Sequence, residues 1–363
     1  MTAPSLPLAG AAPHAHDRAS VDRIMLQVCF ALAPATAFGF YLFGWPAIFL
    51  WLFTCTGALI TEALCLWGQG QPLARLKDSS ALLTGWLLAL SLPPWAPWWI
   101  GVGGAAFAIG IGKQVYGGLG QNLFNPAMLA RVALLISFPV QMSTWANVTP
   151  FGSLLAPSIG DGLGITLGLT SIPDGATGAT ILGEAKANYT TSLPIGDMLA
   201  QHFSLGQAFI GHTRGSMGET SELLIFLGGL WLMYLRIISW HIPVAFLASL
   251  AFLSGLFHHA NPARYAAASV HLTSGGIAMG AFFIATDYVT SPASNKGKLI
   301  FGIGCGFMVF VIRAYSGFPE AVAFAVLFMN ALTPLIDRIT KPRSYGRDGR
   351  GRPLKVPSAR KEP

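Results

Sequence analysis

Apolar runs long enough to cross a membrane recur along this chain and limit its possible folds more than any other feature. A transmembrane helix needs roughly 20 mostly apolar residues. Only 10% of the 363 residues are charged and 53% are hydrophobic, whereas soluble domains carry about 25% charged residues. We therefore predict an all-α integral membrane protein with about ten transmembrane helices, near residues 24–43, 46–67, 80–93, 96–112, 127–145, 221–236, 241–258, 271–286, 299–313 and 319–337.

Local patterns refine this prediction. The third run is short and ends at Pro93-Pro94, where proline cannot continue a helix, so a broken or half-length helix is expected there. The polar start of the chain lacks the pattern of a cleavable signal peptide, so the first span is expected to remain. Neither the cysteines nor the histidines have metal-ligand spacing, and the glycine-rich stretches lack a Walker lysine. No metal site and no conventional nucleotide site are predicted.

The distribution of basic residues predicts the orientation. If both termini are cytoplasmic, 18 of the 22 Lys and Arg residues fall on the cytoplasmic side, as the positive-inside rule requires. The predicted organisation then begins with a cytoplasmic segment (1–23), a first half of five spans (24–145) and a periplasmic connection (146–220). A second half of five spans (221–338) and a basic, disordered tail that meets lipid headgroups (339–363) follow. The tail explains the net charge of +7 without nucleic acid.

A weak internal similarity links the two halves. The first half has Leu-Thr-Gly at residues 83–85, an apolar run, Pro-Pro at 93–94 and a Tyr-Gly-Gly turn at 116–118. The second half has Leu-Thr-Ser-Gly at 272–275, an apolar run, Ser-Pro at 291–292 and a Tyr-Ser-Gly turn at 315–317, in the same order. This order predicts two repeats of inverted topology, a design that places broken helices and a ligand or ion site at the repeat interface. Chance similarity between glycine-rich membrane sequences is the alternative.

A polar loop of small residues, Asp174-Gly-Ala-Thr-Gly-Ala-Thr180, lies in the predicted connection. Its glycines and alanines leave room for a flat group against the backbone. A phosphate could be esterified to the hydroxyl of Thr180 or, equally, of Thr177. We interpret the loop as a covalent attachment site for a cofactor, with an ordinary turn as the alternative.

Residues 211–221 form a second polar segment on the same predicted side. The guanidinium of Arg214 matches phosphate oxygens. Ser216, Glu219 and Thr220 suit the start of a helix, where hydroxyl and carboxylate groups satisfy free amides. We expect these four residues near the small-residue loop.

A third polar segment, residues 113–126, is predicted on the cytoplasmic side. Tyr116, Gly118, Asn122 and Asn125 could line a site for a flat heterocycle. The alternative is a re-entrant turn whose backbone needs amide partners, because lipid supplies none.

Two carboxylates are further candidates. Glu62 lies inside the second span and Asp287 at the end of the eighth. A carboxylate within a membrane is costly and suggests a function by default. The alternatives are that Glu62 reaches water and that Asp287 caps its helix or pairs with a lysine.

Six ordered segments carry a resemblance to a known family: residues 116–128, 138–145, 174–180, 215–221, 281–292 and 318–337. Over residues 20–337 the chain resembles the D subunits of Rnf complexes, which are membrane ferredoxin:NAD oxidoreductases of the bacterial inner membrane. It is more distantly similar to the B subunits of sodium-pumping NADH:quinone reductases. The short segment before the first span favours the Rnf type.

The resemblance implies a covalent cofactor. In such subunits FMN is joined through a phosphoester to the last Thr of the motif, here Thr180, by a flavin transferase that uses FAD. Asp174 would orient the loop or help to hold a metal during transfer, and Gly178 and Ala179 would let the transferase approach. This chain has Thr177 where Ser is frequent, and Ile181 where Pro often follows the acceptor.

The resemblance also implies a second flavin and partners. Non-covalent riboflavin is expected in this subunit, and we assign it to Tyr116, Gly118, Asn122 and Asn125. Arg214, Ser216, Glu219 and Thr220 would surround the FMN. The subunit would relay single electrons among Rnf subunits A, B, C, E and G, coupled to movement of Na⁺ or H⁺. The alternatives are a subunit of the quinone-reductase type and a redox-inactive channel or scaffold.

Overall fold

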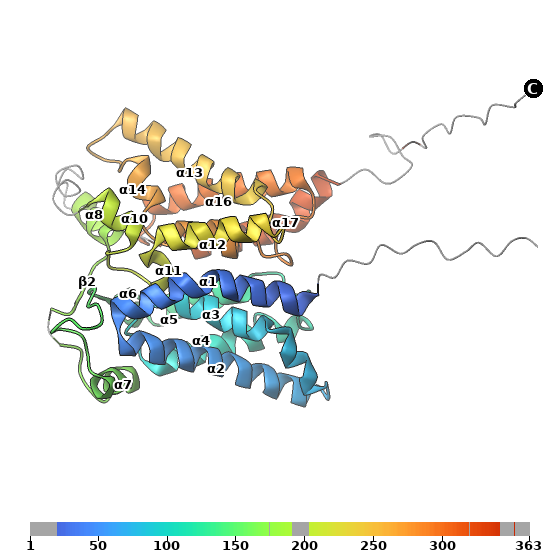
Figure 1. Cartoon of the computed structure of the whole chain (residues 1–363). Coiled ribbons are helices and arrows are strands. Elements are labelled where there is room, and N and C mark those ends of the chain that lie inside the picture. Colours follow the sequence, from blue (N-terminus) through green and yellow to red (C-terminus); the bar gives the residue numbers. More distant parts are fainter. Residues whose placement is uncertain (1–19, 174, 191–202, 319, 342–351, 353–363) are drawn as a thin grey trace, which may run out of the picture.

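Long and short helices build the chain (Figure 1). The computed structural model describes residues 20–173, 175–190, 203–318, 320–341 and 352, without the side chains of residues 188–190. Within these residues five helices are long and apolar enough to cross a membrane. They are α1 (Val21–Phe43), α2 (Trp45–Gly68), α13 (His241–Ala260), α16 (Asn295–Tyr315) and α17 (Val322–Ile339). This arrangement is that of an integral membrane protein.

Shorter elements complete the bundle and its loops. Four apolar helices have 12 or 13 residues: α3 (Ser80–Ser91), α4 (Trp98–Gly110), α5 (Pro126–Ser137) and α12 (Glu222–Tyr234). The remaining elements are η1 (Leu73–Asp78), η2 (Gln114–Tyr116), α6 (Pro139–Ser143), β1 (Trp145–Ala146), α7 (Ile159–Leu167), β2 (Thr177–Gly178), α8 (Ile181–Thr190), α10 (Leu205–Ile210), α11 (Met217–Thr220), α14 (Ala268–Leu272), α15 (Ile277–Met279) and the π-helix η3 (Gly280–Ile284).

Two of the predicted spans are broken. The run predicted at 127–145 is divided into α5 and α6 at Pro139, which has no N–H to donate to a continuing helix. The run predicted at 271–286 is divided into α14, a turn, α15 and η3. Gly275 in that turn has φ +73°, a left-handed conformation that favours glycine. The third run is a half-length helix, as predicted, because α3 ends at Ser91.

The helices contact one another in two groups. In the first, α2 packs against α3 and α4, and α4 packs against α5; in the second, α13 packs against α14 and α16, and α16 packs against α17. Helix α1 also contacts α2 and α3 of the first group, and α12 contacts α15 and η3 on the side of the second. The two halves meet where α1 lies beside α12 and where α5 contacts α17 (Figure 1). Gly228 of α12 faces the backbone of Ala31, and a side chain there would collide with that backbone. Small residues allow such close approach between membrane helices.

The two ends of the bundle differ. Val21 at the start of α1 and Ile339 at the end of α17 lie at one end, called here the terminal end (Figure 1). The opposite end carries β2, α7, α8, α10 and α14 and is called here the loop end (Figure 1). The small-residue loop therefore lies at the end opposite the described termini.

Candidate functional site

A short sheet holds the small-residue loop at the loop end. Gly178 pairs with Trp145 and Thr177 with Ala146 in antiparallel register. Beside this pairing, Asn147 donates from its side chain to the carbonyl of Gly175 at 2.7 Å. The loop is thus fixed to the segment after α6. Asp174, which we predicted to orient the loop, lies outside the described residues.

Thr180 directly precedes α8 and caps it. Its Oγ1 accepts from the backbone N–H of Gly183 at 3.2 Å, and its carbonyl accepts from the N–H of Glu184 at 2.8 Å. The Thr180 side chain is buried and faces a small cavity shared with Arg214, Glu219 and Gly275. The free N–H groups of a helix start attract phosphate. The surroundings of Thr180 therefore suit a phosphoester.

Arg214 lies directly over the loop. A Cβ added to Gly178 would come within 2.5 Å of Arg214 Nη1, so glycine is what allows this approach. The same Nη1 lies 3.4 Å from Glu184 Oε1 in a partly exposed ion pair. The structure brings Arg214, Thr177, Gly178, Ala179 and Thr180 together, and the cation is available to an anion beside Thr180.

The predicted caps after Arg214 differ from those observed. Ser216 precedes α11 but makes no side-chain cap, and its buried Oγ has no hydrogen-bond partner. The Thr220 hydroxyl donates to the carbonyl of Met217 at 2.8 Å. Ser221 is the residue that caps α12, accepting from Leu224 N at 3.3 Å. Of Ser216, Glu219 and Thr220, Glu219 is the residue that lines the Thr180 cavity.

Beneath Thr180 lies a buried charged cluster that sequence reasoning missed. Arg131 of α5 pairs with Glu320, which precedes α17. Arg313 of α16 donates to the carbonyls of His271 and Ser274, each at 2.7 Å. Both arginines line a cavity with Glu219. Contrary to the prediction from the positive-inside rule, Arg131 does not mark the cytoplasmic side, because it is buried in the bundle near Glu219.

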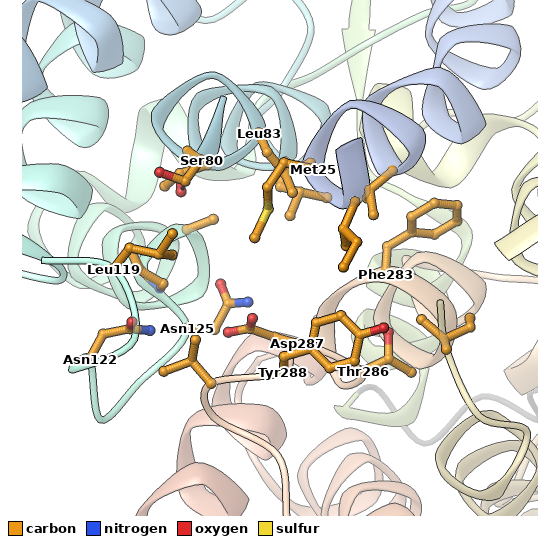
Figure 2. A pocket seen from close by; sticks show the side chains of 18 of the residues that line it. Met25, Ser80, Leu83, Leu119, Asn122, Asn125, Phe283, Thr286, Asp287 and Tyr288 are labelled. Atoms are coloured by element: carbon orange, nitrogen blue, oxygen red, sulfur yellow. Dashed lines mark hydrogen bonds between the residues drawn. The ribbon is translucent and has the colours of Figure 1, made fainter. Parts of the chain in front are cut away.

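At the terminal end a further cavity lies between the two halves of the bundle (Figure 2). Asn122 and Asn125 are buried in it, and Asn125 lies next to Asp287. Asn125 also caps α5, accepting from Met128 N at 3.2 Å, and Asn122 donates to the carbonyl of Phe124 at 3.1 Å. The empty space of the cavity, including the solvent at its mouth, is about 770 Å³.

Two of the residues assigned to this site are not in its lining. Tyr116 is 39% exposed and lies outside the cavity. Gly118 has φ +95° and its N–H donates to the carbonyl of Lys113 at 3.1 Å, so it closes the turn that carries Lys113. Asp287 accepts from the hydroxyl of Thr290 at 3.1 Å.

Glu62 and Lys113 form a buried ion pair beside this cavity. Lys113 Nζ lies 2.8 Å from Glu62 Oε1 and donates to Ser80 Oγ at 2.7 Å, and Gln114 Nε2 donates to Glu62 Oε1 at 2.7 Å. The Lys113 and Glu62 side chains are 3% and 5% exposed. Glu62 therefore does not reach water. The sequence signals were the place of Glu62 inside an apolar span and a Lys-Gln pair directly after another apolar run.

Together, these features define a helical membrane protein with a polar site at each end, one of them around a threonine beside a cation. Residues 9–346 match the model of the NQR2, RnfD, RnfE family. The chain belongs to this family.

Curated relatives with high identity share one name, which describes the D subunit of an ion-translocating oxidoreductase complex. The protein of Stutzerimonas stutzeri is 61% identical over 337 residues, 93% of this chain and 95% of the relative. That of Halorhodospira halophila is 51% identical over 95% of this chain and 97% of the relative. That of Rhodobacter capsulatus is 47% identical over 85% of each.

Proposed function

We propose that this chain is the D subunit of an ion-translocating oxidoreductase complex of the Rnf type and that it carries FMN in a phosphoester bond to Thr180. The subunit role rests on the relatives of that name, which align over nearly their whole length. The observation that carries the attachment site is the Thr180 hydroxyl, which faces a cavity shared with Arg214 at the start of α8.

The neighbours of Thr180 fit a phosphodiester. Arg214 supplies a positive charge, and Gly178 leaves space for it. The N–H of Gly183 already donates to the Thr180 hydroxyl and can donate to a phosphate oxygen instead. Thr177 is engaged in β2, and the cavity that contains Arg214 and Glu219 includes Thr180 but not Thr177. These contacts favour Thr180 as the acceptor.

The attachment is a group transfer from FAD by a flavin transferase. The Thr180 oxygen forms the new bond to phosphorus, the pyrophosphate bond of FAD breaks, AMP leaves and the hydroxyl proton passes to solvent. When bound, FMN would supply electron-transfer chemistry that amino-acid side chains lack. The protein contributes placement and charge.

The cavity at the terminal end is proposed to hold the second flavin, riboflavin. Asn122 and Asn125 provide amide groups, and Leu83, Leu119 and Phe283 provide apolar walls (Figure 2). This division suits a flat ring with one polar edge. Tyr116 and Gly118 contribute through the shape of the loop rather than by lining the cavity.

We also propose ten membrane segments in two inverted repeats. The matched packing of α2, α3 and α4 and of α13, α14 and α16 supports this. In a bacterial inner membrane the terminal end would be cytoplasmic and the loop end periplasmic. Electron flow among Rnf subunits would be coupled to movement of Na⁺ or H⁺.

In-gel flavin fluorescence after denaturation tests the proposal. The full chain, produced with a flavin transferase, should give a fluorescent band that disappears in Thr180→Ala and persists in Thr177→Ala. A band that persists in Thr180→Ala would show that the acceptor is another residue. Absence of a band from the wild-type chain would favour a redox-inactive channel or scaffold.

A further inference from the structure

A recess lies beside the Thr180 cavity at the loop end. It is bounded by α8, by residues 264–271 and by α16, and its volume is about 620 Å³ including the space at its mouth. Leu182, Val270 and Phe310 give it apolar walls, and Tyr265 adds an aromatic ring. Small-molecule sites are mainly lined by apolar and aromatic side chains, with a few polar groups that orient the ligand.

The recess adjoins the attachment site. Leu182 lines both the recess and the Thr180 cavity. It shares one face of α8 with Ala185 and Lys186, three and four residues further on, which also line the recess. The side chains of Arg313 and Leu182 both lie close to the backbone of Gly275. A Cβ added to Gly275 would lie 2.6 Å from Arg313 Nη2 and 3.2 Å from Leu182 Cδ1, so the missing side chain allows this close packing.

Two buried side chains in the recess have polar atoms without protein partners. His271 is 8% exposed, and its Nδ1 makes no hydrogen bond. Arg313 is 8% exposed; its two terminal nitrogens are occupied by the carbonyls of His271 and Ser274, but its Nε is unpaired. Buried polar atoms normally have a partner. These two atoms therefore point to a ligand with a polar edge.

We propose that this recess binds the isoalloxazine ring of the flavin attached at Thr180, an inference that rests on the proposed phosphoester. The ring would contact the apolar and aromatic side chains that line the recess, including Tyr265, Val270 and Phe310. Its edge of carbonyl oxygens and ring nitrogens faces His271 Nδ1 and Arg313 Nε. The Arg313 cation also favours the more electron-rich, reduced form of the ring, because opposite charges attract strongly in a poorly hydrated site.

The neighbouring space on the other side of Thr180 is a poorer site for the ring. It is open, and besides Ala179 and Ile181 its lining is polar or charged, including Glu184, Gln207 and Arg214. That lining suits a phosphate and its counter-charge, whereas a flat apolar ring gains more from the aromatic wall of the recess.

The lifetime of flavin fluorescence tests this assignment in the purified full chain. A tyrosine in contact with an excited flavin quenches it by short-range electron transfer, and phenylalanine does not. Tyr265→Phe should therefore lengthen the lifetime several-fold. Tyr315→Phe is the matched control, because the Tyr315 hydroxyl lies 3.3 Å from that of Tyr265 but outside the recess. The Thr180→Ala protein gives the signal of any other bound flavin, which is subtracted.

A second variant fills the recess. Ala314 lines it from α16, and Ala314→Phe should displace the ring, so that iodide quenches its fluorescence several-fold more strongly. A covalent band with an unchanged lifetime in Tyr265→Phe and unchanged iodide quenching in Ala314→Phe would overturn the recess while leaving the attachment intact. Absence of the band from the wild-type chain would instead overturn the attachment, and the ring assignment with it.

Discussion

The buried Glu62–Lys113 pair gives a prediction with a magnitude. Lys113→Met removes the cation and leaves the Glu62 carboxylate buried with Gln114 as its remaining donor. Removing one partner of a buried ion pair costs about 3–5 kcal/mol. At about 2.1 cal/mol/K of unfolding entropy per residue, a chain of this length would melt about 4–7 °C lower.

The assay is thermal unfolding of the detergent-purified full chain. Unfolding is measured as the loss of the monodisperse gel-filtration peak after heating to increasing temperatures. Lys77→Met, on η1 at the same end of the bundle, is the control and should melt as wild type does. Adding Glu62→Gln to Lys113→Met removes the unpaired charge and should restore at least half of the lost stability. Wild-type melting of Lys113→Met alone would refute the reasoning.

Three further outcomes are expected. Asn125→Ala removes the cap of α5 and should lower the free energy of unfolding by about 1 kcal/mol, measured by chemical unfolding; no change would show that the cap is replaced. Gly228→Leu should abolish the monodisperse peak because α12 contacts α1 there, whereas Gly255→Leu on α13, with open space around it, should preserve the peak; equal yields would contradict this packing. Gly178→Val should displace the Arg214 side chain and weaken the covalent flavin band; a band of wild-type intensity would argue against a role for that cation.

Several features were predictable because local chemistry decides them. Composition predicted a membrane protein, and Pro93-Pro94 predicted a half-length α3. The small-residue loop and the segment around Arg214, more than 30 positions apart in the chain, were expected to meet, and Arg214 does lie over Gly178. In these cases a residue type carries one dominant physical constraint, such as a missing N–H or a missing side chain.

The buried ion pairs were not predictable, because their partners are distant in sequence. Glu62 and Lys113 come from α2 and the loop after α4, and Arg131 and Glu320 from opposite halves of the chain. A basic residue near a span end is assigned by default to a membrane surface, and only the packing of the helices reveals its carboxylate. The break at Gly275 was also missed, because a glycine in an apolar run is equally compatible with a continuous membrane helix.

Peptide mass mapping tests the central claim most directly. The wild-type full chain is produced with a flavin transferase, digested, and its fluorescent peptide fragmented. The account predicts a peptide containing Thr180 that is heavier by FMN less one water, with the added mass on Thr180. Flavin mass on Thr177, or fluorescent protein in which Thr180 is unmodified, would contradict it.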